Sequence, residues 1–155
     1  MNRYLCLLFL FLFSCSWKVT PESVATLYMK NRYFNPSNAY RMIKPGQITK
    51  SAFLLKHEEM LRIKDYNLKS IIKFKAIKTE THSNGVIVTV ETIRPNLRKV
   101  FSSFYQEKIS NNWNKKQIRI EIMKRLKDPK CPKETLIDQI QLEQTPTGWR
   151  VIVLK

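Results

Sequence analysis

Glycine, cysteine and histidine are scarce in this sequence. Its 155 residues include three glycines, so it has no glycine-rich loop of the kind that binds phosphate through backbone N–H groups. Three cysteines and two histidines do not have the spacing of a zinc site, and the cysteines provide no disulfide framework. No G-x-S-x-G nucleophile motif occurs either. We therefore expect no cofactor, no metal and no disulfide scaffold.

The sequence also lacks an apolar run long enough to span a membrane. Its longest run, the nine residues from Leu5 to Phe13, is about half of the roughly 20 that a transmembrane helix needs. One charge, on Arg3, precedes the run, and a small residue, Ser14, follows it. This order of charge, short apolar stretch and small residue is typical of a secretory signal peptide. We predict that residues 1–14 are such a peptide.

Residues 12–15 (LFSC) resemble the lipobox of bacterial lipoproteins. The resemblance implies a diacylglycerol group on the Cys15 thiol and cleavage between Ser14 and Cys15, which leaves residues 15–19 as a lipidated N-terminus and short linker. Acyl chains contribute about 0.8 kcal/mol per buried methylene and hold such a protein at a membrane. Ser16, in place of Asp, resembles lipoproteins of the outer membrane in cells with two membranes. An ordinary signal peptide and an N-terminal core segment stay open as alternatives.

Prolines that follow capping residues mark the first helices. Thr20-Pro21-Glu22 combines an N-cap, a proline at the first helical position and an acid at the positive end of the helix dipole. Val24, Leu27 and Tyr28 then follow at helical spacing. Asn35-Pro36 repeats the signal, and Pro45-Gly46 ends the second helix. The expected helices of this part cover residues 21–32, 36–43 and 49–65.

The pattern then changes to the period-two alternation of strands. Residues 68–77 alternate, with Ser70, Ile72, Phe74 and Ala76 as the inward set. Asn84-Gly85 predicts a two-residue hairpin turn, because both positions tolerate positive φ. The remaining expected elements are a return strand over 86–92 with Val86, Val88 and Val90 inward, helices over 97–109 and 113–127, and a hairpin of 135–144 and 149–154.

Helices grouped before an antiparallel sheet are typical of the α+β class. We expect residues 20–155 to form a single α+β domain, in which the N-terminal helices pack on a curved antiparallel sheet of about four strands. A basic helical insert, residues 96–133, separates the two hairpins. The hydrophobic content of 43% supports a folded core.

Three segments, Thr20-Pro21-Glu22, Asn84-Gly85 and Thr147-Gly148-Trp149-Arg150-Val151, resemble small bacterial lipoproteins of the nuclear transport factor 2-like superfamily. The resemblance implies a cystatin-like α+β cone over most of residues 20–155. Members of that superfamily include binding modules, isomerases and dehydratases, and the enzymes use an Asp or His in an apolar cavity. Because this range of activities shares one fold, the resemblance implies a pocket and no particular reaction.

Two residues are candidates for chemistry in such a pocket. Asp138 interrupts an apolar alternation between Leu136 and Ile140, and a buried Asp has a raised pKa and can act as a base. A strand that starts later, with Asp138 solvated at its end, is the alternative. His57 shares a helix face with Leu54 and Leu61, which predicts a half-buried side chain. We assign no catalytic residue.

Acidic residues number 12 against 28 Lys and Arg, so the net charge is +16. Residues 98–133 hold eleven Lys or Arg and three acids, a net +8 that attracts polyanions. Two interpretations of this basic insert stay open, a solvated helix face and a surface that contacts anionic lipid, polysaccharide or an envelope protein. Nucleic acid is not expected, because the signal peptide predicts export. The candidate contact residues are Lys115, Lys116, Arg119, Lys124, Arg125 and Lys127.

These observations favour an exported lipoprotein of the bacterial cell envelope, attached to membrane lipid through acylated Cys15. Its domain is expected to be a non-catalytic module that binds a ligand or partner. A small pocket enzyme of the isomerase or dehydratase type, and electrostatic adhesion to anionic envelope components, are the alternatives. Cys131 lies between Pro129 and Pro132 and is expected to be a loop thiol.

Overall fold

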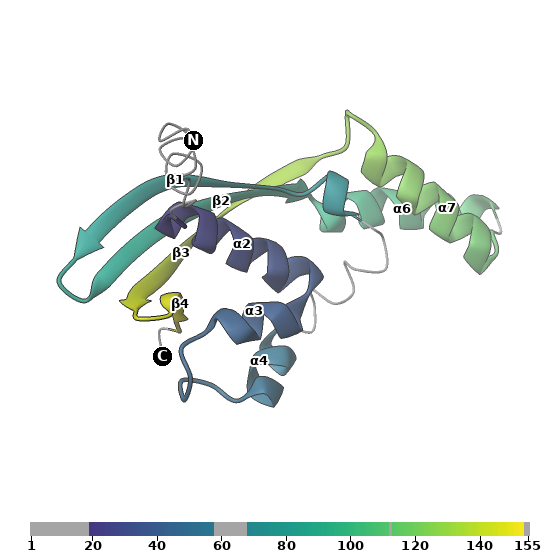
Figure 1. Ribbon diagram of the computed structural model, residues 1–155. Helices are drawn as coiled ribbons and strands as arrows, with labels where there is room; N and C mark the ends of the chain where they lie inside the picture. The colour runs from purple at the N-terminus through teal and green to yellow at the C-terminus, as the bar shows by residue number, and fades with distance from the viewer. Residues whose placement is uncertain (1–18, 58–67, 112, 154–155) are drawn as a thin grey trace, which may run out of the picture.

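The computed structural model describes residues 19–57, 68–111 and 113–153 (Figure 1). The predicted signal peptide, the lipobox with Cys15, and the second half of the helix expected over 49–65 lie outside these ranges. Within them, no helix combines the length and the apolar character that crossing a bilayer requires.

The expected α+β class is confirmed, with the N-terminal helices before a four-stranded antiparallel sheet in the order β1-β2-β3-β4. α2 lies along one face of the curved sheet, and the helices of the insert extend beyond its end, on the side opposite the β1–β2 turn (Figure 1). The elements are α2 (Pro21–Phe34), α3 (Pro36–Met42), α4 (Lys50–Lys56), η1 (Leu68–Ser70), β1 (Lys73–His82), β2 (Gly85–Pro95), α6 (Leu97–Asn111), α7 (Lys115–Lys127), β3 (Lys133–Thr145) and β4 (Gly148–Ile152).

α2 begins as the sequence predicts. The Ser23 N–H donates to the Thr20 hydroxyl oxygen (3.3 Å), which supplies one of the partners that the first turn of a helix lacks. The helix continues two residues beyond the expected end and stops at Asn35, before Pro36. Its buried face differs from the expected one, since Leu27 is half exposed. The residues that α2 buries are Val24, Ala25, Tyr28, Met29, Tyr33 and Phe34.

The expected strand over 68–77 is wrong at its start. Leu68–Ser70 form a 3-10 turn, and the N–H groups of Ile71 and Ile72 donate to the Leu68 carbonyl oxygen at 2.9 and 3.0 Å. Leu68 and Ile72 are four residues apart, so they fit a helical turn as well as a strand. Because the chain turns here, Ser70 is exposed instead of inward. β1 then extends to His82, with a bulge between Ala76 and Lys78.

The first hairpin turn is shifted by one residue from the expected position. His82 pairs with Gly85, so the two loop residues are Ser83 and Asn84. Gly85 has a φ of +134°, and a Cβ placed on it would lie 2.2 Å from the carbonyl oxygen of Leu142 in β3. Glycine is therefore required because β2 and β3 approach closely here, in addition to any requirement of the turn.

The core lies between α2 and the sheet. Val88 and Val90 of β2 are fully buried, as expected from the alternation, and Leu142 of β3 joins them. Met29 and Tyr33 of α2 cover them from the helix side. The ring of Tyr33 meets that of Phe74 edge to face, with 5.2 Å between the ring centroids. These contacts hold α2 on β1–β3.

α6 and α7 follow β2 and precede β3 in the sequence, and they form a smaller helical part beyond the end of the sheet (Figure 1). A capping box opens α7: the Gln117 N–H donates to the Asn114 side chain, and the Asn114 N–H donates back to Gln117. We refer to residues 97–127 as the α6–α7 arm. The buried apolar residues of the two helices, among the side chains described, are Val100, Phe104, Ile122 and Leu126.

Candidate functional site

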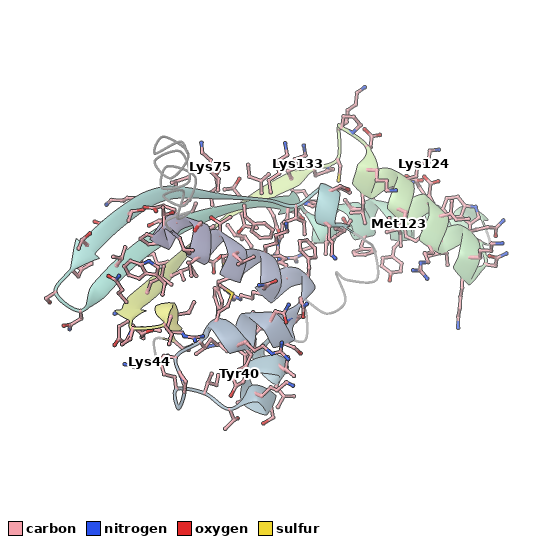
Figure 2. The ribbon with its side chains drawn as sticks, in the orientation of Figure 1. Tyr40, Lys44, Lys75, Met123, Lys124 and Lys133 are labelled. Carbon is pink, nitrogen blue, oxygen red and sulfur yellow. The ribbon has the colours of Figure 1, made fainter. Side chains whose placement is uncertain are left out.

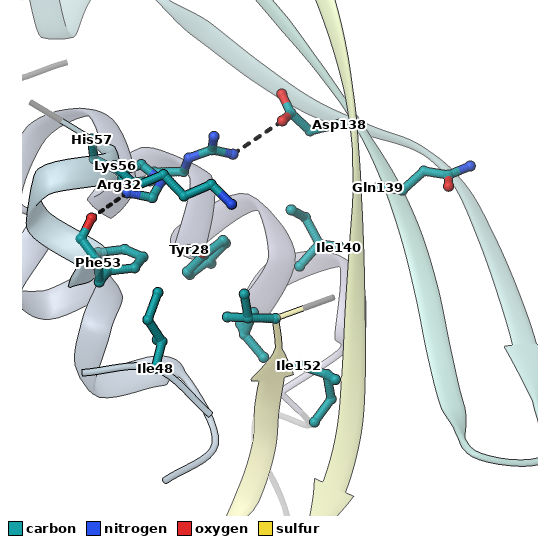
Figure 3. Close-up of a pocket in the computed structure, with 12 residues that line it drawn as sticks. Tyr28, Arg32, Ile48, Phe53, Lys56, His57, Asp138, Gln139, Ile140 and Ile152 are labelled. Atoms are coloured by element: carbon teal, nitrogen blue, oxygen red, sulfur yellow. Dashed lines mark hydrogen bonds and ion pairs between the residues drawn. The ribbon is translucent and has the colours of Figure 1, made fainter. Parts of the chain in front are cut away.

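A pocket of about 210 Å³ lies where α2 and α4 meet β3 and β4 (Figure 3). Its apolar wall includes Ile48 from the loop before α4, Phe53 from α4 and Ile140 from β3. Its polar residues include Arg32, His57 and Asp138. Apolar walls with a few converging polar groups are typical of small-molecule sites.

Arg32 and Asp138 form an ion pair across this pocket, with 3.1 Å between Arg32 Nη1 and Asp138 Oδ1 (Figure 3). The side chains are 23% and 28% exposed, so each charge is partly desolvated. Neither alternative for Asp138 is correct: it is not a lone buried acid, and it is not at a strand end, since β3 begins five residues earlier at Lys133. Asp138 lies inside the strand because Arg32 compensates its charge.

The Arg32 guanidinium has unused hydrogen-bonding capacity. Its Nε is buried and finds no hydrogen-bond partner among the residues that the structure describes. Its Nη1 contacts the Met29 sulfur at 3.8 Å as well as Asp138. A buried N–H without an acceptor costs free energy, but this Nε is closed off from solvent, so a ligand in the pocket would meet the exposed part of the Arg32 side chain instead.

His57 is more buried than expected, with 6% of its surface exposed. Its Nδ1 lies 2.7 Å from the Phe53 carbonyl oxygen, which fits the tautomer that donates from Nδ1. Its ring stacks on Phe53 with 4.3 Å between centroids. Burial lowers the pKa of His57 below its usual 6.5, so the ring is neutral at pH 7. Leu61, its expected neighbour, lies outside the described residues.

Tyr28, Lys56 and Gln139 are the other polar residues of the lining. Tyr28 lies between Phe53 and Ile140 (Figure 3), and burial raises the pKa of its phenol, which stays protonated. Lys56 precedes His57 at the end of α4 and adds a positive charge. With Arg32 and Asp138, the named charged groups give the pocket a net positive charge.

Sequence reasoning identified Asp138 and His57 and missed Tyr28, Arg32 and Lys56. A signal for one pair was present, because Tyr28 and Arg32 are four residues apart and lie on the same face of α2. A charged residue within an apolar helical stripe indicates a buried ionic partner. That this partner is Asp138, 106 residues away in the sequence, depends on how α2 packs on the sheet.

The structure exposes most of the candidate basic residues of the arm and turns one of them inward. Five of the six candidates are exposed, namely Lys115, Lys116, Arg119, Lys124 and Lys127. Arg125 instead lies inward, where its guanidinium sits 5.6 Å from the centroid of the Phe104 ring and bonds to Glu107 and Glu121. These bonds raise the pKa of Arg125 further. Arg125 therefore holds α7 on α6 and does not belong to the outward surface.

Cys131 is a loop thiol, as expected, and it is buried. Burial raises its pKa, which keeps the thiol protonated and weakly nucleophilic. Among the described residues, no group of three or more His, Cys, Asp or Glu has a geometry that holds a metal ion. Comparison of the chain with protein-family models, with curated proteins and with solved structures finds no match.

Proposed function

We propose that this protein is an exported lipoprotein, anchored through Cys15, whose α+β domain binds a small anionic ligand in the pocket between α2, α4, β3 and β4. The observation that carries the proposal is the partly desolvated Arg32, which is bound by Asp138 on one side and keeps 23% of its side chain exposed in a pocket that Lys56 also lines. The nuclear transport factor 2-like resemblance stays a prediction and is consistent with a pocket at this position.

The pocket supports a ligand with a short apolar part and a carboxylate. Phe53, Ile48 and Ile140 provide apolar contact, whereas Arg32 and Lys56 provide cations. Arginine and lysine cations both form charge-assisted hydrogen bonds to carboxylates. The volume of about 210 Å³ limits the ligand to a small molecule.

The polar groups favour binding over proton transfer. The Asp138 carboxylate is engaged by Arg32, which competes with any substrate proton for its oxygens. The Nδ1 of His57 is engaged by the Phe53 carbonyl oxygen, and no described carboxylate orients the ring as in a catalytic triad. The proposal is therefore a binding module.

The anchor would hold the domain close to the bilayer. Thr20, the N-cap of α2, is the fifth residue after Cys15, and an extended chain over those five steps spans at most about 18 Å. The N-terminal end of α2 points away from the α6–α7 arm (Figure 1). The lipid and the arm would thus contact the cell envelope at two separate places.

Ligand binding is tested by calorimetry of the purified protein with small monocarboxylates such as butyrate and benzoate. We expect Arg32→Met to abolish binding, because it removes the cation that would pair with the carboxylate. Lys30→Met, an exposed lysine on the same helix, removes the same charge and should bind as the parent does. Equal binding by the parent and Arg32→Met contradicts the assignment of Arg32, and turnover of a bound carboxylate contradicts the non-catalytic function.

The anchor is tested separately by mass spectrometry of the protein from its own membranes. We expect an N-terminal peptide that begins at Cys15 and carries acyl chains. The Cys15→Ser chain should lack the lipid and lose membrane attachment. Mature protein that still begins at Met1 contradicts the anchor and leaves the pocket proposal to the calorimetry.

A further inference from the structure

The outward face of α7 has an ordered arrangement of charge and apolar surface. Lys116, Ile120, Met123 and Lys127 are spaced by four, three and four residues, so they form one line along the helix. The opposite side of α7 buries its apolar residues against α6. Ile120 is 59% exposed although it lies in the middle of this line. We call these four residues the α7 stripe.

Further cations flank the stripe, and a single exposed acid, Asp128, follows its last lysine among the described residues of α7 and its cap. Arg119 and Lys124 lie on its two sides, and both are exposed. Figure 2 shows Met123 and Lys124 on α7, the helix farthest from the body of the protein. Of the acids nearest to the stripe in the sequence, Glu121 binds Arg125 on the inward side, and Asp128 is the exposed C-cap residue of α7, where it accepts from the Lys130 N–H. The stripe therefore has an apolar centre and a basic rim.

Arg125 determines which way the stripe faces. Its bonds to Glu107 of α6 and Glu121 of α7, together with its contact to Phe104, fix the rotation of α7 about its own axis. It acts as a positioning residue for the surface on the other side of the helix.

This pattern fits a bilayer surface better than a protein groove. A convex helix face with one isoleucine and one methionine offers little area for a shaped interface, whereas a fluid headgroup layer adapts to it. Lysine side chains can lie along the apolar boundary and place their ammonium groups on lipid phosphates. Each such lysine contributes about 1 kcal/mol at an anionic surface.

We propose that the α7 stripe docks on an anionic phospholipid surface. Ile120 and Met123 enter the headgroup boundary, and Lys116, Arg119, Lys124 and Lys127 contact lipid phosphates. This docking goes beyond the proposed ligand pocket and uses a different part of the molecule from the Cys15 anchor. It orients a domain that the anchor alone would leave free to rotate.

The test uses the full chain with an environment-sensitive fluorophore on Ile120→Cys, incorporated into vesicles. We expect a blue shift in vesicles of phosphatidylcholine with phosphatidylglycerol, no shift in pure phosphatidylcholine, and reversal of the shift by high salt. The same fluorophore on Ser83→Cys, in the exposed β1–β2 turn, should show no shift in either vesicle. The parent chain reports any labelling of buried Cys131.

Charge reversal provides the second arm of the experiment. Lys116→Glu with Lys127→Glu should weaken docking by at least about 30-fold, which corresponds to two lysine contacts of about 1 kcal/mol each. Lys30→Glu with Lys50→Glu changes the net charge equally at exposed sites outside the arm and should leave the shift unchanged. A shift that is equal in both vesicles, or that survives reversal of the stripe, overturns the proposal. Because the readout is at residue 120, it separates docking from lipid anchoring.

Discussion

The two parts of this molecule bury their side chains in different ways. The body, made of α2–α4 and the sheet, buries a continuous aromatic and aliphatic layer that includes Tyr33, Phe53 and Val88. Among the described side chains of the α6–α7 arm, four apolar residues are buried, and they form a narrow seam between the two helices. A broad core leaves few residues of α2 free to vary, whereas a narrow seam leaves most of α7 in solvent. The arm is therefore the part of the fold that can present a surface.

The ion pairs of the body and of the arm also differ in which elements they connect. In the body, β3 supplies the acid of three pairs between separate elements, Arg94–Glu134, Arg32–Asp138 and Lys44–Glu143. In the arm, the described ion pairs converge on the single guanidinium of Arg125. The body thus uses charge to attach helices and strands to β3, and the arm uses it to set the rotation of one helix. Four predictions test this contrast.

Tyr33→Ala should have the largest effect, because it removes a ring that is 1% exposed at the centre of the body. The lost contacts with Phe34 and Phe74 and the cavity left behind should lower the free energy of unfolding by about 4 kcal/mol. Thermal unfolding should occur more than about 10 °C lower. Tyr33→Phe is the matched control, since it loses only the bond from Arg94 and should cost about 1 kcal/mol. Equal costs for the two variants would show that the ring is not a core residue.

Phe104→Ala should lower the free energy of unfolding of the arm by about 3 kcal/mol. This is at the low end for a buried ring, because Trp113 and Arg125 can move into the space. Native-state hydrogen exchange should then show lost protection in α6 and α7 and retained protection in the strands. Tyr105→Ala, the exposed neighbour, should change neither. Loss of protection throughout the sheet would mean that the arm and the body unfold as one unit.

Asp138→Asn should lower the free energy of unfolding by about 1 kcal/mol, because it leaves the partly buried Arg32 without its carboxylate partner. The loss is small because water partly screens the site. Glu121→Gln in the arm should cost only a few tenths of a kcal/mol, about the value of a helical pair four residues apart, since Arg125 keeps Glu107. Urea unfolding of the two variants measures the difference. Similar costs would remove the electrostatic contrast between body and arm.

Acidification from about pH 7 to pH 6 should change the free energy of unfolding least, and the change should arise in the body, where His57 lies. Burial lowers the pKa of folded His57 below its unfolded value of 6.5, so the unfolded chain binds the proton more readily. Stability is full above that value and declines as the pH falls from it toward the folded pKa. Between pH 7 and pH 6 the loss is at most about 0.7 kcal/mol.

His57→Gln should remove this part of the pH dependence, and the remaining histidine, His82, provides the background in both chains. Urea unfolding at the two pH values measures it. The hydrogen-exchange protection factors of α6 and α7, which contain no histidine, should not change once the intrinsic pH dependence of exchange is divided out. A steeper loss in the His57→Gln chain than in the parent contradicts a neutral buried ring.

Much of the fold follows from local signals in the sequence. Thr20-Pro21 placed the start of α2, Pro129 and Pro132 separated α7 from β3, and the Val86-Val88-Val90 alternation identified the inward face of β2. The errors occurred where two periods fit the same residues. Leu68 and Ile72 suit a strand and a helical turn equally, and only the burial of Leu68 under its neighbours decides between them.

The sequence by itself determined the order of helices and hairpins, the charge of the insert, and the presence of one acid within the alternation of β3. These depend on neighbouring residues, whose propensities and spacing act over a turn or a strand. Only the tertiary structure decided that Asp138 pairs with Arg32, that His57 closes a pocket, and that Arg125 alone among the basic candidates turns inward. Those outcomes depend on which surfaces exclude water when distant segments pack, and no local pattern specifies that.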